Sequence, residues 1–277
     1  MRQFSGKTAF VTGGASGIGL ALGRALANLG MNVMLADVET EALDKAVVDL
    51  RHSGCKVAGI GCDVADPDSV EAAAKATFAA FGHVHVVCNN AGVAAGGGID
   101  DISLDNWRWV IDVNLMGVVH GIRSFLPHIR AHGEGGHIVN TASMAGLTAG
   151  YGFSPYAASK FAVVAMSEGL ALQLKPHGIG VSVLCPSYVR TRIGESGRNR
   201  LPRYGEAPRL DPASPAGLML AEIDRRLAGG LEPSDVAARV IAAIRQDELY
   251  VFTHPNMREE VDQRFAAIQA AMDRVVG

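Results

Sequence analysis

The sequence predicts a single α/β domain over residues 1–277, built on a doubly wound parallel sheet of seven strands with helices on both faces. Short apolar segments alternate with longer segments of helical periodicity along the chain. The apolar segments, such as Val84–Cys88, are close to continuously apolar, as in a parallel sheet that is covered on both faces. A length of 277 residues with 48% apolar residues suits one domain with a large core.

The elements are expected in alternation, which gives right-handed crossovers and places ligands at the carboxyl ends of the strands. The expected strands are Thr8–Thr12, Asn32–Ala36, Lys56–Gly61, Val84–Asn89, His137–Thr141, Gly180–Cys185 and Leu249–Thr253. The expected helices are Ile18–Leu29, Glu41–His52, Pro67–Phe81, Leu104–Ala131, Pro155–Lys175, Ser234–Arg245 and Arg258–Val276.

One segment, at about 190–230, interrupts this alternation and is rich in proline, with arginines concentrated in 190–209. Insertions of this length are typical of lids or binding loops, so we expect a substrate lid here. A surface insertion without a role is the alternative. The arginines indicate either an acidic substrate or a solvated lid.

Composition excludes several classes of protein. The net charge of −3 argues against nucleic acid or an anionic membrane as a partner. There is no apolar leader in Met1–Val11 and no long uncharged apolar run, so a cytoplasmic location is expected. The four cysteines form no CxxC pair, which favours buried, reduced thiols over disulfides or a zinc cluster. No metal site is predicted.

A glycine-rich turn, Thr12–Gly19 (TGGASGIG), follows the first strand and opens the first helix. A turn without side chains lets backbone N–H groups approach a pyrophosphate, and the helix N-terminus adds a favourable partial charge. The turn therefore predicts a Rossmann-type dinucleotide site.

Asp37 follows the second strand, where a carboxylate can accept hydrogen bonds from a ribose diol and would repel a 2′-phosphate. Neither its neighbours Ala36 and Val38 nor Ala15 and Ser16 offer a basic group to neutralise that phosphate. NAD is therefore favoured over NADP. The alternative is that Asp37 caps the next helix.

Tyr156 and Lys160 are four residues apart in a helical pattern and share one face, while Ser143 follows the fifth strand. A hydroxyl, a phenol and an ammonium can thus converge beside a nicotinamide. An ammonium about 4 Å from a phenol contributes ~4 kcal/mol at an effective dielectric of ~20, and desolvation opposes part of it. Lys160, helped by the cationic nicotinamide, is therefore expected to lower the pKa of Tyr156 toward neutrality. An ordinary loop serine and core tyrosine are the alternatives.

These motifs resemble the short-chain dehydrogenase/reductase family in its compact, NAD(P)-dependent branch. The likeness spans nearly the whole chain in the family's order. The matching pieces are Thr12–Gly19, Cys62–Val64, Asn89–Gly92, Asn114, Ser143, Tyr156–Lys160 and Pro186–Thr191.

The resemblance implies that Ser143, Tyr156 and Lys160 are catalytic. It also implies that Asn114, in a distorted helix, helps hold a water that relays protons to Lys160; a helix-stabilising hydrogen bond is the alternative. Asp63 and Val64 would meet the adenine. The residues implied in cofactor binding are Gly13, Ser16, Gly17, Ile18, Gly19, Asp37, Asp63, Val64, Asn90, Ala91, Gly92, Tyr156, Lys160, Pro186, Val189 and Thr191.

The chain departs from the family after Pro186, where Ser187 replaces the usual glycine. The stretch Ser182–Tyr204 also resembles family members that oxidise benzylic alcohols of lignin-derived aryl ethers, which favours a bulky or aromatic substrate. The residues expected in the substrate pocket are Met144, Phe153, Ser187, Tyr188 and Ile193.

The expected function is an NAD-dependent oxidoreductase that interconverts a secondary alcohol and a ketone. An NADPH-dependent ketoreductase and a non-catalytic dinucleotide-sensing protein are the alternatives. The helices expected at Leu104–Ala131 and Pro155–Lys175 carry apolar residues on more than one face. The resemblance implies that they pair between subunits of a homotetramer (or dimer), unless a single subunit covers them.

Overall fold

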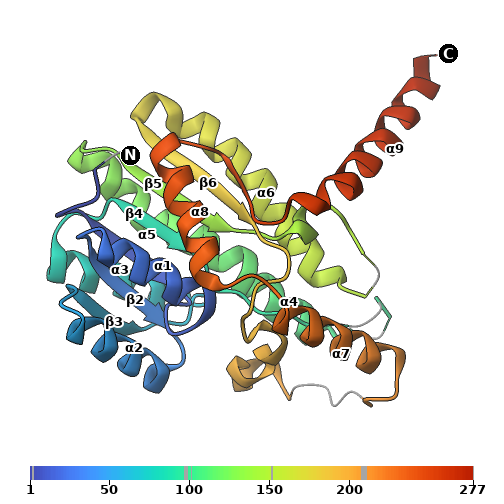
Figure 1. The fold of residues 1–277 in the computed structure, drawn as a ribbon, viewed down its shortest axis with the longest axis horizontal. Coiled ribbons are helices and arrows are strands. Elements are labelled where there is room, and N and C mark those ends of the chain that lie inside the picture. The colour runs from blue at the N-terminus through green and yellow to red at the C-terminus, as the bar shows by residue number, and fades with distance from the viewer. Residues whose placement is uncertain (2, 97–98, 101, 151, 207–210, 277) are drawn as a thin grey trace.

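The computed structural model describes residues 1, 3–96, 99–100, 102–150, 152–206 and 211–276. Their strands form one sheet in the order β3-β2-β1-β4-β5-β6-β7, with every neighbouring pair parallel (Figure 1). The predicted fold class is therefore confirmed. The strands are β1 Thr8–Thr12, β2 Asn32–Asp37, β3 Val57–Gly61, β4 Val86–Asn89, β5 Gly136–Thr141, β6 Ile179–Cys185 and β7 Tyr250–Phe252.

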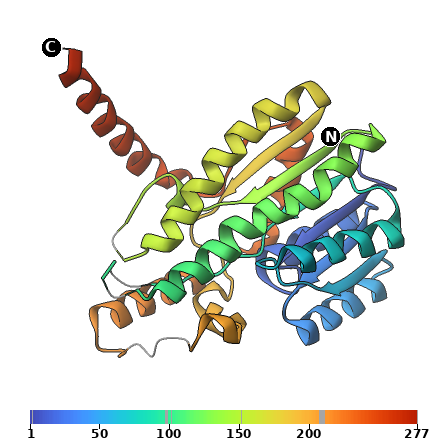
Figure 2. The ribbon, with the colours of Figure 1, turned by 180° about the vertical axis from the view of Figure 1, so that it is seen from behind.

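Helices cover both faces of the sheet. Helices α1, α2 and α8 pack on one face, and α3, α5 and α6 pack on the other, which Figure 2 shows. The helices are α1 Gly17–Asn28, α2 Thr40–His52, α3 Pro67–Phe81, α4 Leu104–Ile111, α5 Gly117–His132, α6 Ser154–Leu174, α7 Pro215–Ala228, α8 Pro233–Gln246 and α9 Arg258–Val276.

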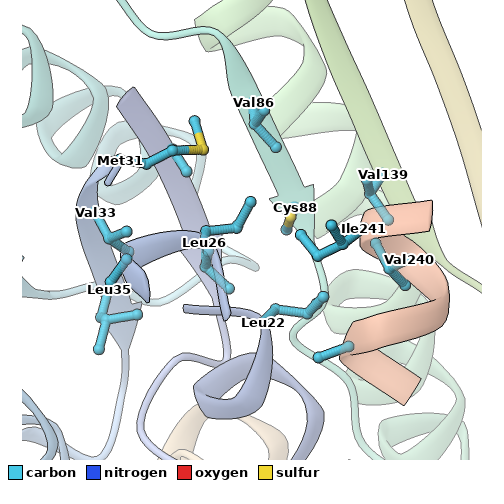
Figure 3. Close-up of a cluster of buried hydrophobic side chains, with 14 of the residues drawn as sticks. Leu22, Leu26, Met31, Val33, Leu35, Val86, Cys88, Val139, Val240 and Ile241 are labelled. Atoms are coloured by element: carbon cyan, nitrogen blue, oxygen red, sulfur yellow. The ribbon is translucent and has the colours of Figure 1, made fainter. Parts of the chain in front are cut away.

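Each face has its own apolar core. On the first, Leu22 and Leu26 of α1 pack beside the strands and toward Ile241 of α8 (Figure 3). On the second, the ring of Phe125 in α5 lies 4.4 Å from that of Phe10 in β1, measured between centroids. Burial of one such side chain contributes about 1.5–3 kcal/mol, so the two cores hold the strand ends in fixed positions.

The helix expected over Leu104–Ala131 is divided, and the prediction of one continuous helix is wrong. Its first part, α4, is capped by Ser103, whose hydroxyl accepts from the Asn106 N–H at 3.2 Å. A π-helical turn, Asp112–Met116, then separates α4 from α5. Such turns often mark functional sites, and this one confirms the distorted helix that the family resemblance implied around Asn114.

The segment at about 190–230, which we expect to be a lid and call the lid below, has its two ends held together by backbone hydrogen bonds. Leu231 donates its N–H to the Tyr188 carbonyl at 3.1 Å and accepts from the Arg190 N–H at 2.9 Å. The lid also contains α7, a helix that the sequence periodicity did not indicate, and its 3₁₀ segment Pro202–Tyr204 lies beside α4. Residues 207–210, with Pro208 and Arg209 of the expected lid, lie outside the described residues.

The C-terminal helix α9 projects away from the body of the molecule (Figures 1 and 2). Its apolar side chains Phe265, Ile268 and Met272 are exposed. Among the helices of the described residues, none combines the length and apolarity needed to cross a membrane. All four cysteines are free thiols, and Cys62, Cys88 and Cys185 are buried.

Candidate functional site

A cleft of about 480 Å³ opens at the carboxyl ends of the central strands. The strand order reverses between β1 and β4, and open α/β sheets bind ligands at such a reversal. The cleft runs from the turn after β1 to the loops after β5 and β6, and the lid forms its outer side. Of the residues expected at the site, all but Gly19 and Asn114 line it.

The glycine turn brings backbone to the floor of this cleft. Gly13 and Gly17 adopt positive φ angles of 65° and 52°, which side chains other than glycine rarely tolerate. A Cβ on Gly13 would lie 3.0 Å from the Ala91 Cα. A Cβ on Gly19 would overlap the Gly13 carbonyl, so Gly19 supports the turn from beneath and does not line the cleft.

The Asp37 carboxylate closes this end of the cleft. Its Oδ2 accepts from the Ala15 N–H at 2.9 Å and its Oδ1 from the Glu39 N–H at 3.0 Å. Burial raises the pKa of Asp37, while these two hydrogen bonds lower it. Glu39, and not Asp37, occupies the N-cap position of α2, so the helix-cap alternative is wrong. Each carboxylate oxygen keeps a second lone pair for a ligand hydroxyl.

Two ion pairs fasten the lid across this end of the cleft. Arg198 donates to Glu39 at 2.8 Å, and Arg203 donates to Asp63 at 2.5 Å. The hydrogen bond from Arg198 holds the pKa of Glu39 below its usual range. Asp63, expected beside an adenine, also accepts from the Ala65 N–H at 3.0 Å.

The other described lid arginines pair within the protein too. Arg190 contacts Glu232 at 2.5 Å and Arg192 contacts Glu195 at 2.7 Å. Arg200 stacks over the Trp109 ring, 5.1 Å from its centroid. These pairings favour arginines that hold the lid in place over arginines that wait for an acidic substrate.

The segment after β4 is held by a threonine that the sequence reasoning missed. The Thr12 hydroxyl accepts from the N–H groups of Asn90 at 2.9 Å and Ala91 at 3.0 Å. The Asn90 side chain donates a hydrogen bond from its Nδ2 to the Thr12 carbonyl at 3.0 Å. The position of Thr12 at the start of the glycine-rich motif Thr12–Gly19 was the available signal. Asn90 thus connects two central strands at the edge of the cleft.

Ser143 and Tyr156 meet on the opposite wall. The Ser143 hydroxyl donates to the Pro186 carbonyl at 3.3 Å and accepts from the Ala145 N–H at 3.1 Å, which fixes its position. Burial raises the pKa of the Tyr156 phenol, and its hydrogen bond with the Ser143 hydroxyl lowers it by less.

Lys160 lies one helical turn beyond Tyr156, as predicted. Its Nζ is buried, donates to the Thr141 carbonyl at 2.9 Å and lies 5.6 Å from the centroid of the Tyr156 ring. Burial lowers the pKa of Lys160 to about 8. The expected lowering of the Tyr156 pKa is not found in the protein alone, because desolvation of the phenol dominates and no nicotinamide charge contributes.

Asn114 lies behind the cleft in the π-helical turn. Its Oδ1 accepts from the Val93 N–H at 2.8 Å, and its Nδ2 donates to the Val93 carbonyl at 2.9 Å and to Ser159 at 3.3 Å. A Cβ added to Gly92 would lie 3.4 Å from Asn114 Oδ1 and 3.6 Å from Lys160 Nζ. The bare backbone of Gly92 therefore leaves space between these two groups.

The part of the cleft next to Tyr156 has largely apolar walls. The five expected pocket residues, Met144, Phe153, Ser187, Tyr188 and Ile193, all line it. One missed residue, Trp109, is one of only two tryptophans and precedes Asn114 in the same expected helix, which was a usable signal. Val113, also missed, directly precedes Asn114 in the π-helical turn. Other missed apolar residues depend on how the lid and the C-terminal region fold back: Leu201, Tyr204, Ile223, Leu227 and Met257.

Comparison with protein families gives a match over residues 7–201 to the family described as short chain dehydrogenase. The chain is 34% identical to the C alpha-dehydrogenase of Sphingobium sp. (strain NBRC 103272 / SYK-6), over 97% of this chain and 87% of that protein. It is also 34% identical to the 1-deoxy-11-beta-hydroxypentalenate dehydrogenase of Streptomyces exfoliatus, over 94% of this chain and 87% of that protein.

A solved structure shares the whole fold. It is a short chain dehydrogenase/reductase from Burkholderia phymatum in complex with NAD, with 39% sequence identity and a TM-score of 0.94. The match covers 98% of this chain and 97% of the other. The likeness thus extends through the lid and beyond the residues that the family match covers.

Proposed function

Because this chain belongs to the short-chain dehydrogenase/reductase family, we propose that it is an NAD-dependent alcohol dehydrogenase. It interconverts a secondary alcohol and a ketone by hydride transfer. One observation carries the proposal: Ser143, Tyr156 and Lys160 line one cleft with the glycine turn and Asp37.

The residues at the other end of the cleft fit NAD. The positive φ angles of Gly13 and Gly17 leave a turn without side chains, against which a pyrophosphate can lie at the start of α1. Asp37 offers its remaining lone pairs to the ribose diol. Since Asp37 and Glu39 are both acidic, and Arg198 already pairs with Glu39, a 2′-phosphate is disfavoured.

The chain's own residues supply binding and proton transfer, and NAD⁺, when bound, supplies the hydride acceptor. Ser143 holds the substrate oxygen through its hydroxyl. Tyr156 takes the alcohol proton on its phenolic oxygen as hydride leaves the carbinol carbon. Lys160 stabilises the phenolate, and its hydrogen bond to the Thr141 carbonyl holds its ammonium in place.

Protons leave the site through the space between Lys160 and Asn114. We assign Asn114 to holding a water there, because its Oδ1 and Lys160 Nζ both border the bare backbone of Gly92. The bonds of Asn114 to Val93 fix its amide, so the helix-stabilising role and the relay role are compatible.

The substrate is a bulky, aromatic secondary alcohol. Trp109, Phe153 and Tyr204 line the cleft, and Tyr204 is held by its hydroxyl, which donates to Asp112 at 3.0 Å. Rings on rigid supports favour an apolar, flat ligand.

An NAD⁺-reduction screen of secondary alcohols, aromatic ones included, tests the proposal. Turnover that Tyr156→Phe abolishes, with NAD⁺ affinity retained, supports the enzyme. A preference for NADP⁺ over NAD⁺ would indicate the ketoreductase instead. Tight dinucleotide binding without turnover of any alcohol or ketone would indicate a dinucleotide-sensing protein.

We further propose a homotetramer in the cytoplasm. Exposed apolar side chains on α6 and α9, such as Leu172 and Phe265, offer surface for subunit contacts. The free thiols of the four cysteines suit a reducing compartment. Light scattering distinguishes the tetramer from a dimer or a monomer.

A further inference from the structure

The wall of the cleft that carries Ser143 is supported from behind by a residue that does not itself line the cleft. Thr253 directly follows β7 and is only 1% exposed. Phe252, the last residue of β7, pairs in parallel with Cys185, the last residue of β6. Because this register aligns the ends of the two strands, Thr253 comes to lie beside the loop that begins at Pro186.

Two contacts hold the hydroxyl of Thr253. Its Oγ1 accepts from the Ser187 N–H at 3.3 Å. Its own proton is therefore available to a second group, and the Nδ1 of His254 lies 2.7 Å from the same oxygen. Burial lowers the pKa of His254, so the ring is neutral at pH 7 and its Nδ1 can accept that proton. The hydroxyl thus has one partner in the loop after β6 and one in the C-terminal segment.

The same loop carries the hydrogen-bond partner of Ser143. The Pro186 carbonyl, one residue before Ser187, accepts from the Met144 N–H at 2.9 Å and from the Ser143 hydroxyl at 3.3 Å. Ser187 itself lines the cleft. A displacement of this loop would therefore move both the Ser143 hydroxyl and part of the wall of the substrate pocket.

We propose that Thr253 is a positioning residue of the dehydrogenase: it holds the loop after β6 so that Ser143 meets the substrate oxygen, and His254 orients its hydroxyl. This inference rests on the proposed function, which assigns the substrate oxygen to Ser143. A misplacement of about 1 Å caused by a change far from the reacting atoms can slow a reaction roughly a hundredfold. The C-terminal segment, whose Met257 also reaches the cleft, thereby becomes part of the substrate end of the site.

The test is Thr253→Val, which removes the hydroxyl and keeps the branched shape of the side chain. We expect kcat for alcohol oxidation to fall about tenfold or more. The Kd for NAD⁺ should change much less, because the glycine turn and Asp37 hold the other end of the dinucleotide. Thr253→Ser keeps the hydroxyl and should retain most of the wild-type kcat.

Thr77→Val is the matched control. Thr77 is fully buried in α3, donates its hydroxyl to the Ala73 carbonyl at 2.7 Å and does not line the cleft. Its loss should lower the free energy of unfolding and leave kcat unchanged. A wild-type kcat in Thr253→Val, an equal loss in the control, or a loss that Thr253→Ser shares in full would each overturn the proposal.

Amide hydrogen exchange gives a second readout that needs no turnover. The Ser187 N–H loses its acceptor in Thr253→Val, so a peptide over residues 186–190 should exchange faster than in the wild type, and no faster in Thr253→Ser. If Thr253→Val does not fold, His254→Phe at a half-buried position replaces it, with changes in the same direction expected. Unchanged exchange would overturn the proposal. A wild type without turnover would refute the proposed function, and the exchange rates would then decide whether Thr253 holds the loop.

Discussion

The two ion pairs at the end of the cleft that Asp37 closes allow a quantitative prediction about the rate of dinucleotide release. Arg198–Glu39 and Arg203–Asp63 join the lid to the ends of β2 and β3. The four side chains are 20–45% exposed, so each pair should contribute near the upper end of the ~0–1 kcal/mol of surface pairs. Together they stabilise the attachment of this segment to the strand ends by up to about 2 kcal/mol.

The double variant Arg198→Met and Arg203→Met removes both pairs and keeps much of the side-chain volume. Since about 1.4 kcal/mol corresponds to a tenfold change, we expect the Kd for NADH to rise about tenfold. The rise should come from faster dissociation and should shrink at high salt, which screens the wild-type pairs. Fluorescence titration and stopped-flow measurement of NADH release provide the assay.

Arg192→Met is the matched control. Arg192 also lines the cleft and carries the same charge, but it pairs with Glu195 inside the lid and does not cross the cleft. Identical Kd values and release rates for the double variant and this control would refute the reasoning. Because Arg198 lowers the pKa of Glu39 below 4.5, its pair is intact above that pH and is lost as the pH falls through the lowered pKa.

Three further predictions concern residues that line the cleft, Lys160, Gly92 and Asp37. Lys160→Met should stabilise the fold by up to ~3 kcal/mol at pH 7. Since burial lowers the pKa of Lys160 from 10.5 to about 8, this advantage should shrink as pH rises between those values in urea-unfolding experiments; a constant difference would contradict it. Gly92→Ala should fold yet slow alcohol oxidation at saturating NAD⁺ at least tenfold, as a methyl group displaces the relay water between Asn114 and Lys160. Gly169→Ala, whose added Cβ meets no atom within 4 Å, is its control, and equal rates would exclude the relay. Asp37→Ala should weaken NAD⁺ binding and improve the NADP⁺ to NAD⁺ affinity ratio at least tenfold, a ratio that competition titration measures.

The sequence was informative wherever a local pattern decides the structure. Apolar runs such as Val86–Asn89 have few alternatives to a buried strand, and the glycine turn can form only where side chains are absent. The positions of Asp37 and Ser143 then followed, because parallel strands bring their carboxyl ends together, and Lys160 followed from its spacing to Tyr156 on one helix.

The sequence predicted where the lid lies in the chain, but not how it folds. Its helix α7 and the contacts of Arg198 and Arg203 depend on partners more than a hundred residues away, which no local pattern encodes. For the same reason the histidines around Glu134, His83, His85 and His132, were not singled out: the α3–β4 connection and the end of α5 bring them together only after the sheet has formed.

The predicted lowering of the Tyr156 pKa is not found in the protein alone, and the cause points to how the site is activated. Burial raises the pKa of Tyr156 and lowers that of Lys160, so in the protein alone the phenol holds its proton more firmly. A phenolate there needs positive charge nearby, and the ammonium of Lys160 supplies only part of it at 5.6 Å from the ring centroid. In our proposal Tyr156 therefore becomes an effective base only once the oxidised dinucleotide adds its positive charge to the cleft.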